Sequence, residues 1–492
     1  MAKMWLLLRL FIFAFLFTFP FVHSRPSPQS YKTTILNVSA SIQNTFNLLS
    51  LHPKTTQAFT EQEHSFGSVD SPSSKLSLQL QTRTSVWGTS QTDYKSLILA
   101  RLERDSARVR SLSTRLDLAI KRVSKSDLRP LDNGLEFQPE DLEGPIVSGS
   151  SQGSGEYFSR VGIGNPPSQV YMVLDTGSDV NWLQCAPCSD CYQQADPIFE
   201  PTSSSSYSPL TCDTKQCKSL DESDCRNGTC LYEVSYGDGS YTVGDFATET
   251  ITLGSAKVNN LAIGCGHTNE GLFVGAAGLL GLGGGSLSFP SQINATSFSY
   301  CLVDRDSDAA STLEFDSPFP QNVVTASLLR NPELDTFYYL GLTGLSVGGK
   351  LLSIPESAFK IDETGNGGII IDSGTAITRL QTDTYNSLRD AFVKGTQNLV
   401  STSGMSLFDT CYDLSSKSSV QVPTVSFHFA DGKSLRLPPK NYLIPVDSSG
   451  TFCFAFAPTT SSLSIIGNVQ QQGTRVSFDL VNSLVGFSPD KC

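Results

Sequence analysis

The sequence predicts an all-β protein built as two lobes, and three observations lead to this expectation. Short runs rich in Val, Ile, Phe and Tyr alternate with turns of Gly, Ser, Asn and Pro through most of the chain, which is typical of β-strands. An apolar run that ends in an Asp-Thr/Ser-Gly turn occurs twice, at Asp175 and again 197 residues later at Asp372. Roughly 340 residues surround the two turns, which is enough for two lobes with separate cores.

The N-terminus carries the pattern of a secretory signal. Residues 5–22 are apolar with Arg9 among them, and the small residue Ser24 precedes Arg25. This segment is too short and too close to the N-terminus to favour a membrane span, so we expect a cleavable signal over residues 1–24. No later segment approaches 18 unbroken apolar residues, and the C-terminus lacks a hydrophobic tail for a lipid anchor. We therefore expect a secretory-pathway protein without a membrane anchor.

Charge divides the remaining chain into a basic part and an acidic part. Residues 25–134 carry 15 Lys and Arg against 9 Asp and Glu, a net charge of +6, whereas residues 135–492 carry 18 against 38, a net charge of −20. The basic part centres on residues 97–110, which have helical spacing and good helix formers. A basic helix can bind nucleic acid or an anionic membrane. Behind a signal peptide, we expect it instead to lie against its own acidic body as a removable prosegment.

Two stretches of the basic part have less periodicity. Residues 30–90 are rich in Ser, Thr and Gln, and we expect them to be poorly ordered once the prosegment is cleaved. Residues 130–145, between two prolines and with several acids, resemble an exposed linker where processing should occur.

The two Asp turns belong to a longer internal repeat. Each turn places a carboxylate at the end of a buried strand, followed by a glycine that permits a tight turn and by hydroxyl residues that can orient the carboxylate. An apolar pair followed by glycine comes 106 residues after Asp175, at Gly281, and 95 residues after Asp372, at Gly467. Four elements in the same order indicate an internal duplication. We infer two halves that each deliver one Asp to a shared site.

These motifs resemble the pepsin-type aspartic proteases, and more narrowly the nepenthesin-like group of plants, with the guard-cell aspartic proteases as the nearest match. The resemblance runs from about Gly155 to Cys492 and includes parts of the prosegment. It implies a bilobal pepsin-like fold with two pseudo-symmetric β lobes and the active-site cleft between them. The lobes would span residues 135–330, with a cysteine-rich insert at 185–230, and residues 331–492. For a plant protein the expected location is the extracellular apoplast, with the vacuole or the ER lumen as alternatives.

The resemblance also implies roles for single residues. Asp175 and Asp372 match the catalytic pair, and Tyr236 matches the tyrosine of a flap that closes over the substrate. The other positions implied in binding or support are Gly177, Ser178, Gly374 and Thr375 in the two turns, Gly237 and Asp238 at the flap tip, and Trp182, which matches the indole that supports the tyrosine.

Twelve cysteines, an even number, predict disulfides in an oxidising compartment. The close spacing of Cys185, Cys188 and Cys191 could also be a metal-binding knuckle, but the signal peptide argues against free thiols, so we expect no metal. Spacing alone leaves the connectivity open. The resemblance implies six pairs, namely Cys185–Cys188, Cys191–Cys265, Cys212–Cys230, Cys217–Cys225, Cys301–Cys492 and Cys411–Cys453.

Other local signals concern modification and helices. Asn37, Asn227 and Asn294 begin glycosylation sequons. Residues 382–392 have an N-cap residue and apolar positions at helical spacing, which predicts a helix. The roughly 120 residues after Asp372 leave no room for the saposin-like insert of typical plant vacuolar aspartic proteases.

Two neighbouring carboxylates indicate acid–base chemistry. Like charges about 3 Å apart cannot both ionise, so the pair holds one proton over an acidic range; aspartic proteases are the standard example of such a pair. The ionised member can take a proton from water while the protonated member donates to the scissile carbonyl. This titration belongs to the pair rather than to either residue. The reaction needs no cofactor, and its substrates are extended peptides. We expect the chain to act as a monomer and to bind no nucleic acid.

Three other functions compete with proteolysis. A serine or cysteine hydrolase would need a histidine partner, and neither His267 nor His428 lies in a nucleophile motif. The glycine-rich residues 281–286 lack the Gly-Lys-Ser/Thr of a phosphate loop. The stronger alternative is a catalytically silent relative that binds and inhibits glycoside hydrolases. Because Asp175 and Asp372 are both present, the sequence favours an active endopeptidase, secreted as a zymogen, inhibited by its prosegment and active at acidic pH. By resemblance, a role in plant stress or abscisic-acid response is possible.

Overall fold

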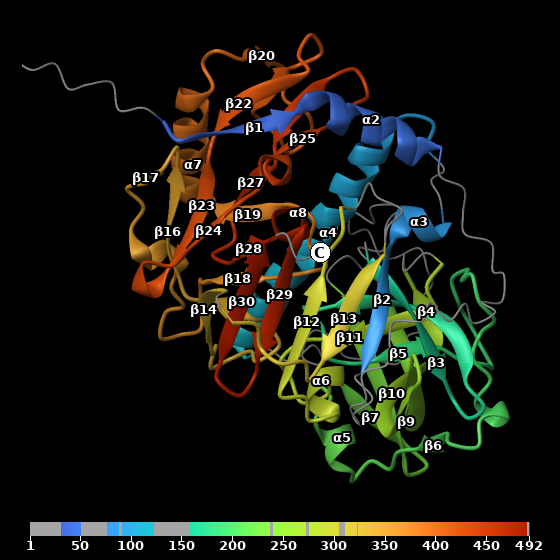
Figure 1. The fold of residues 1–492 in the computed structure, drawn as a ribbon. Helices are drawn as coiled ribbons and strands as arrows, with labels where there is room; N and C mark the ends of the chain where they lie inside the picture. Colours follow the sequence, from blue (N-terminus) through green and yellow to red (C-terminus); the bar gives the residue numbers. More distant parts are fainter. Residues whose placement is uncertain are drawn as a thin grey trace, which may run out of the picture.

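The computed structural model describes residues 31–50, 76–87, 91–122, 157–236, 240–271, 275–304, 310–321, 323–489 and 492. The expected signal at 1–24 and linker at 130–145 lie outside the described residues. Within them the chain is mostly β and folds as two lobes, as the sequence predicted (Figure 1). None of the helices in this described part is long and apolar enough to cross a membrane.

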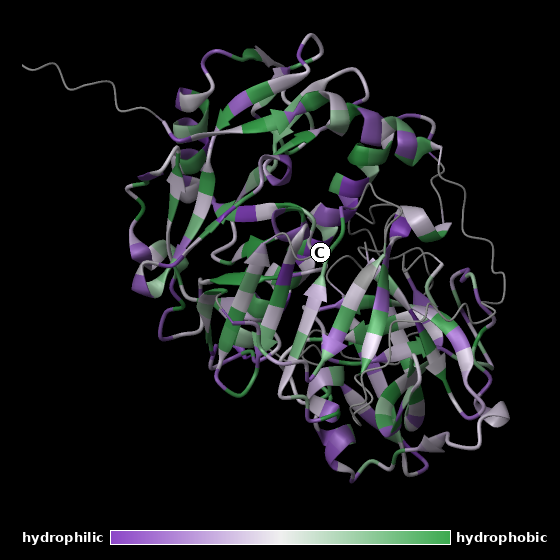
Figure 2. Ribbon diagram, viewed as in Figure 1, coloured by the Kyte–Doolittle hydropathy of each residue, from purple (hydrophilic) through white to green (hydrophobic). Residues whose placement is uncertain are grey.

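The N-terminal lobe is a layered β structure built around a long hairpin. Its strands β9 (Tyr241–Leu253) and β10 (Ala256–Glu270) pair antiparallel, and every second residue along β9 faces the core over much of its length. Hydrophobic residues gather on the strands and polar residues on the loops (Figure 2). The other elements of this lobe are β3 (Tyr157–Ile163), β4 (Ser168–Asp175), β5 (Trp182–Gln184), η2 (Pro201–Ser203), β6 (Ser208–Pro209), α5 (Lys215–Lys218), β7 (Ser223–Arg226), β8 (Thr229–Ser235), β11 (Gly278–Gly281) and α6 (Phe289–Gln292).

The C-terminal lobe combines short strands with one regular helix. Helix α7 (Thr382–Gly395) confirms the helix predicted at residues 382–392, and it buries Leu388 and Phe392, which are spaced by one turn. The strands and short helices of this lobe are β15 (Tyr339–Leu340), β16 (Leu342–Val347), β17 (Lys350–Leu351), η3 (Glu356–Phe359), β18 (Ile369–Ile371), β19 (Thr378–Gln381), β20 (Val400–Thr402), β21 (Cys411–Asp413), β22 (Ser419–Pro423), β23 (Val425–Phe429), η4 (Ala430–Gly432), β24 (Ser434–Arg436), η5 (Pro439–Asn441), β25 (Leu443–Pro445), β26 (Thr451–Phe454), β27 (Phe456–Thr459), β28 (Ser464–Ile466) and α8 (Asn468–Gln471).

Antiparallel strands from both halves of the sequence join the lobes. Strands β12 (Ser297–Cys301) and β13 (Ser311–Phe315) pair with each other, and β12 also pairs with β29 (Thr474–Asp479) near the C-terminus. Strand β14 (Val324–Leu329) pairs with the last strand, β30 (Leu484–Pro489). The rings of Phe298 and Phe478 stack at 4.4 Å between centroids across this junction. The first half of the chain is therefore fixed to the second by backbone pairing as well as by side-chain packing.

The N-terminal basic segment is folded onto both lobes. Strand β1 (Thr33–Asn37) pairs with β22, and β2 (Ser77–Thr82) pairs with both β3 and β13. Helices α2 (Val38–Leu49) and α3 (Arg83–Trp87) follow these strands. The helix predicted around residues 97–110 is confirmed as α4 (Tyr94–Lys121), which Asp93 caps by accepting a hydrogen bond from the Ser96 amide at 2.9 Å. Parts of the 30–90 stretch are thus regular structure in the uncleaved chain.

The repeat seen in the sequence corresponds to the same strand pairing in each lobe. Strand β4, which ends at Asp175, runs parallel to β11, and β18, which ends just before Asp372, runs parallel to β28. Strand β11 ends at Gly281, the glycine of the first apolar-pair motif, and β28 is followed directly by Gly467, the glycine of the second. A Cβ at Gly281 would lie 2.5 Å from the Asp179 carbonyl oxygen, and one at Gly467 would lie 2.6 Å from the Ala376 carbonyl oxygen. Both glycines are needed because the backbone of each Asp turn passes so close.

The disulfides of the cysteine-rich insert correct the implied connectivity. The pairs Cys301–Cys492 and Cys411–Cys453 are found as the resemblance implied. The other four implied pairs are wrong, because the structure joins Cys185–Cys265, Cys188–Cys191, Cys212–Cys225 and Cys217–Cys230.

Burial explains this rearrangement. Cys185 and Cys265 lie on the adjacent strands β5 and β10, and both are fully buried. Cys217 and Cys230 face the core of the N-terminal lobe, whereas Cys225 is exposed. Cys225 and Cys230 face each other across the β7–β8 hairpin, but the buried Cys230 bonds to the buried Cys217 and the exposed Cys225 bonds to Cys212. Sequence spacing does not show which cysteines are buried.

The close approach at Gly467 gives a stability prediction. Gly467→Ala should lower the free energy of unfolding by about 1–3 kcal/mol, the usual cost of overpacking, because its Cβ would press on backbone atoms that cannot move aside. Gly341→Ala is the matched control, since its Cβ would have no neighbour closer than 3.5 Å. Thermal unfolding of both variants makes the comparison, and equal Tm values would contradict the proposed steric role.

Candidate active site

Asp175 and Asp372 are brought together at the ends of two buried apolar strands. Asp175 is the last residue of β4, and Asp372 directly follows the three isoleucines of β18. Each Asp is only 1% exposed. A carboxylate in such surroundings is costly unless hydrogen bonds and opposite charge compensate for the lost water, so the partners of these two groups define the site.

Each carboxylate is held by its own turn in the same way. The Ser178 hydroxyl donates a short hydrogen bond to Asp175 Oδ2, and the Gly177 amide donates to Oδ1 at 3.0 Å. In the second turn the Thr375 hydroxyl donates to Asp372 Oδ2 at 2.6 Å, and the Gly374 amide donates to Oδ1 at 3.2 Å. The four turn residues singled out in the sequence therefore orient the two carboxylates.

Hydrogen bonds between the lobes lock the two turns to each other. The Thr176 hydroxyl accepts from the Ser373 amide at 2.9 Å and lies 3.2 Å from Asp372 Oδ1. Within the C-terminal lobe, the buried side chains of Asn468 and Gln471, on α8, donate to the carbonyls of Ser373 and Asp372 at 2.9 and 3.1 Å and hold the second turn in place. A lobe movement that separated the carboxylates would break the bonds of Thr176.

Tyr236 lies at the end of the β8–β9 hairpin, beside the first carboxylate. Its hydroxyl accepts a hydrogen bond from Trp182 Nε1 at 2.9 Å, the contact that the resemblance implied. Trp182 is fully buried on β5 and fixes the position of this hydroxyl. Burial raises the pKa of Tyr236 well above its usual value, so it stays neutral. Gly237 and Asp238, the expected flap tip, lie outside the described residues.

Arg108 of helix α4 occupies the space between the two carboxylates. Its Nη1 donates to Asp175 Oδ2 at 2.8 Å, and its Nη2 makes a short contact with Asp175 Oδ1. Nη2 also donates to Asp372 Oδ1 at 3.0 Å, and Nε donates to Asp372 Oδ2 at 3.2 Å. One guanidinium thus binds both aspartates. The sequence indicated a basic helix against an acidic body, but nothing in its pattern singled out Arg108 as the residue that reaches the pair.

Helix α4 runs through the region between the lobes (Figure 1). Side chains along its length contact both lobes. Apolar residues near its start pack with Ile377 and Ala376, and residues near its end pack with Phe337 and Ile370. Arg115 lies 3.4 Å from Asp179, and Arg122 forms two hydrogen bonds with Glu333. The helix therefore fills the place where an extended peptide would bind.

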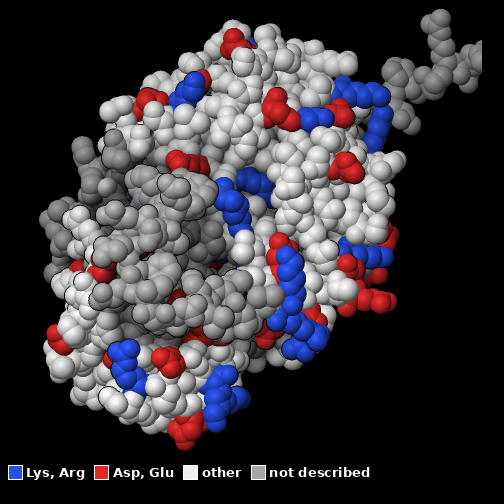
Figure 3. Space-filling view, turned by 180° about the vertical axis from the view of Figure 1, so that it is seen from behind, with Lys and Arg blue, Asp and Glu red and all other residues white. Residues whose placement is uncertain are grey.

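Three basic residues of α4 face inward. Arg101, Arg104 and Arg108 are buried, whereas Lys95, Arg110 and Lys121 are exposed. On the face shown in Figure 3, basic and acidic side chains are interspersed.

The ion pair changes the titration of the first carboxylate. Burial by itself would raise the pKa of Asp175, but the Arg108 guanidinium, together with the bonds from Ser178 and Gly177, lowers it below its ordinary value. Because the docked helix lowers this pKa, the ionised Asp175 stabilises the docked helix at neutral pH. This stabilisation is lost as pH falls below about 4 and through the lowered value. The contact between α4 and the aspartates is therefore weaker in acid.

A third buried acid near the site, Asp179, was missed in the sequence. Asp179 accepts hydrogen bonds from the Thr336 hydroxyl at 2.5 Å and the Gly285 amide at 2.9 Å. Burial raises its pKa even though Arg115 opposes this. It connects the first Asp turn to the start of the second lobe. Two sequence features could have pointed to Asp179. It ends the Asp-Thr-Gly-Ser-Asp sequence of the first turn, and a glycine-rich run follows 106 residues later, at Gly285.

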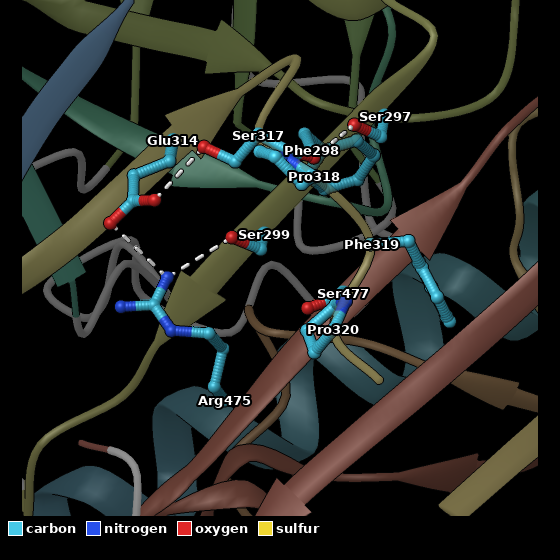
Figure 4. Close-up of a pocket in the computed structure, with 10 residues that line it drawn as sticks. All are labelled: Ser297, Phe298, Ser299, Glu314, Ser317, Pro318, Phe319, Pro320, Arg475 and Ser477. Atoms are coloured by element: carbon cyan, nitrogen blue, oxygen red, sulfur yellow. Dashed lines mark hydrogen bonds and ion pairs between the residues drawn. The ribbon is translucent and has the colours of Figure 1, made fainter. Parts of the chain in front are cut away.

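Pockets also lie outside this site. They include one of about 750 Å³ beside β14 and one of about 400 Å³ between β1 and η5. Figure 4 shows a smaller pocket of about 70 Å³ between β12, β13 and β29, where Arg475 lies 3.3 Å from Glu314 and donates to Ser299 at 3.1 Å. Among the described residues, no group of three or more His, Cys, Asp or Glu is placed to hold a metal ion.

Two Asp-Thr/Ser-Gly turns that face each other from two β lobes are the architecture of the pepsin-type aspartic proteases. Residues 157–316 match the family model described as Xylanase inhibitor N-terminal, and residues 337–489 match Xylanase inhibitor C-terminal. The chain belongs to this plant family of pepsin-type aspartic proteases and is an aspartic endopeptidase.

Curated relatives with similar sequences are named as proteases. The chain is 48% identical to Protein ASPARTIC PROTEASE IN GUARD CELL 2 of Arabidopsis thaliana, over 86% of this chain and 89% of the relative. It is 50% identical to Aspartyl protease family protein 2 of the same plant, over 89% of both chains. Aspartic proteinase nepenthesin-1 of Nepenthes gracilis is 41% identical over 77% of this chain and 86% of the relative.

Solved structures share the fold at low identity. The crystal structure of edgp has a TM-score of 0.57 and 20% identity, covering 68% of this chain and 91% of that one. That of conglutin gamma, a basic 7S globulin from lupine seeds, has a TM-score of 0.54 and 20% identity, covering 69% and 93%.

The buried ion pair predicts a large effect of one substitution. Arg108→Gln should weaken the docking of α4 by about 3–5 kcal/mol, because it leaves two buried carboxylates without their cation. Hydrogen exchange of the α4 amides at neutral pH measures this as faster opening. Arg122→Gln, at the C-cap that follows α4 and with a side chain 78% exposed, is the control and should change exchange little. Equal protection in both variants would contradict the role of Arg108.

Proposed function

We propose that this chain is the zymogen of an acid-activated aspartic endopeptidase, in which Asp175 and Asp372 are the catalytic pair and Arg108 blocks them until processing. The observation that carries the proposal is the contact of one prosegment guanidinium with both carboxylates. The positive guanidinium of Arg108 balances the negative charge of the two carboxylates, which a bound water and a shared proton would otherwise do. While α4 is docked, neither the attacking water nor the peptide has room.

In the processed enzyme the two turns supply the chemistry. The ionised member of the pair takes a proton from a bound water, and the protonated member donates to the carbonyl oxygen of the scissile bond. The attack gives a tetrahedral diol without a covalent intermediate. Ser178 and Thr375 hold the outer oxygens, so the inner oxygens point at the water. The Tyr236 hairpin closes over the substrate and excludes solvent.

Acid activates the zymogen through the same contact. As pH falls, Asp175 is protonated, its attraction to Arg108 is lost, and the net charge of the body becomes less negative. Helix α4 then leaves the cleft in the pH range where one shared proton makes the pair competent. A cut between about Lys125 and Gly155 makes the change permanent.

The cellular compartment and the physiological role are proposed from the disulfides, the glycosylation sequons and the named relatives. The six disulfides suit an oxidising, secretory compartment, and we place the enzyme in the apoplast. Asn37, Asn227 and Asn294 are exposed, as acceptors of N-linked glycans must be. The relative named for guard cells is the reason to propose a role in plant stress or abscisic-acid response.

A second function has one observation in its favour. The descriptions of both family models name a xylanase inhibitor. The second candidate function is therefore binding of glycoside hydrolases in place of peptide cleavage. The complete set of turn hydroxyls and both carboxylates favours proteolysis. A xylanase assay with and without the processed protein decides this alternative directly.

The catalytic assignment predicts the effect of removing either carboxylate. Asp175→Asn or Asp372→Asn should reduce kcat by about 10²–10⁴-fold, because an amide keeps the volume but cannot hold the shared proton. Pepstatin-sensitive cleavage of a peptide at acidic pH gives the measurement. Asp390→Asn, an exposed acid on α7, serves as control. More than about a hundredth of wild-type turnover in either site variant would refute the pair.

Processing can be separated from catalysis with the same variant. The full-length Asp372→Asn chain, incubated in acid, should stay intact alone and be cut within residues 125–155 when active enzyme is added. N-terminal sequencing of the product identifies the cut. Cleavage of the variant alone would refute self-processing, and full activity of the uncut wild-type chain at neutral pH would refute inhibition by the prosegment.

A further inference from the structure

One acidic residue of the prosegment is buried against the second Asp turn. Asp105 lies one helical turn before Arg108 on α4 and is only 3% exposed. Its carboxylate accepts from the backbone amides of Ala376 and Ile377, the latter at 3.3 Å, and forms an ion pair with Arg379 Nη2 at 2.6 Å. Two amides and a guanidinium thus converge on one carboxylate.

The other side of this contact belongs to the enzyme body. Arg379 lies on β19, four residues after Thr375, and pairing of β19 with β27 and β28 fixes its backbone. Its Nη1 donates to the nearby Ile377 carbonyl at 3.3 Å, which holds the guanidinium in place. In the described part of the chain, the ion-pair partner of Arg379 is Asp105. Processing would remove this counter-charge together with the prosegment.

We propose that Arg379, Ala376 and Ile377 form a carboxylate pocket in the processed enzyme, and that this pocket selects substrates with an Asp or Glu side chain near the scissile bond. The inference rests on the proposed function and names a substrate class for it. A guanidinium and two amides are the donors that bind carboxylates best, through charge-assisted hydrogen bonds. Asp105 occupies the pocket in the zymogen as the substrate side chain would occupy it later.

The geometry limits where the acidic residue lies in the substrate. Asp105 and Arg108 are separated by three helical residues, a rise of about 4.5 Å along the axis. An extended peptide advances about 3.3 Å per residue. Since Arg108 marks the position of the scissile bond, the acidic side chain lies within about two residues of it. The side of the bond is found by moving one Glu through the positions of a peptide series.

The test compares Glu and Gln at each position in otherwise identical peptides. Enzyme processed from the full-length chain is assayed at pH 5, above the ordinary Glu pKa of about 4.3. At the position that meets the pocket, kcat/KM should be about 10- to 100-fold higher for Glu than for Gln, the range for hydrogen bonds to charged groups. Arg379→Gln should bring this ratio close to one. Arg389→Gln, an arginine of α7 paired with Asp409, should keep it.

Each outcome supports or overturns the pocket. A ratio near one at every position in the wild type, or a ratio that survives Arg379→Gln, overturns it while leaving the protease function intact. If no peptide is cut, the proposed function fails, and a binding measurement still decides the pocket. For that arm, the Asp372→Asn chain carries an engineered protease site between residues 122 and 157. After cleavage the prosegment is removed at acidic pH by size-exclusion chromatography, and peptide affinity is then measured by fluorescence anisotropy at pH 5. Tighter binding of Glu than Gln peptides that Arg379→Gln removes supports the pocket, and equal binding overturns it.

Discussion

Two carboxylates buried side by side need a positively charged partner, and many contacts in this structure hold that partner in place. In the uncleaved chain the partner is Arg108, and its reach to both aspartates requires α4 to lie between the lobes. This position in turn depends on apolar packing at both ends of the helix and on the strands that precede it. The duplicated β framework, with its hydrogen bonds between Thr176 and Ser373, holds the two Asp turns against each other independently of α4 contacts.

The fold could be predicted well from the sequence because its signals are local and repeated. Apolar runs before Asp175 and Asp372 become the paired strands β4 and β18, and the glycines of the second motif lie where a Cβ would collide with backbone. The basic helix was also visible, because a long helix carries its own periodicity. Trp182 and Tyr236 meet as the resemblance implied.

The parts that could not be predicted depend on distant contacts. Which of several arginines on α4 reaches the pair is set by the rotation of the helix about its axis, and this rotation is fixed by packing against both lobes. The cysteine pairing failed for a similar reason, since Cys225 and Cys230 face each other across the β7–β8 hairpin and their partners, Cys212 and Cys217, come from the segment that precedes it. Asp179 was overlooked because its partners, Thr336 and Gly285, are more than 100 residues away in sequence.

The strands of the prosegment separate the cutting of the chain from the release of the cleft. Strand β1 is paired along five residues with β22, and β2 is inserted between β13 and β3. A single cut in the linker breaks none of these backbone hydrogen bonds. If the chain is processed as proposed, the immediate product is a two-chain complex in which β1 and β2 stay paired with the body, and the free enzyme forms by dissociation. Dilution favours this step, whereas a high local concentration of the cut prosegment opposes it by mass action.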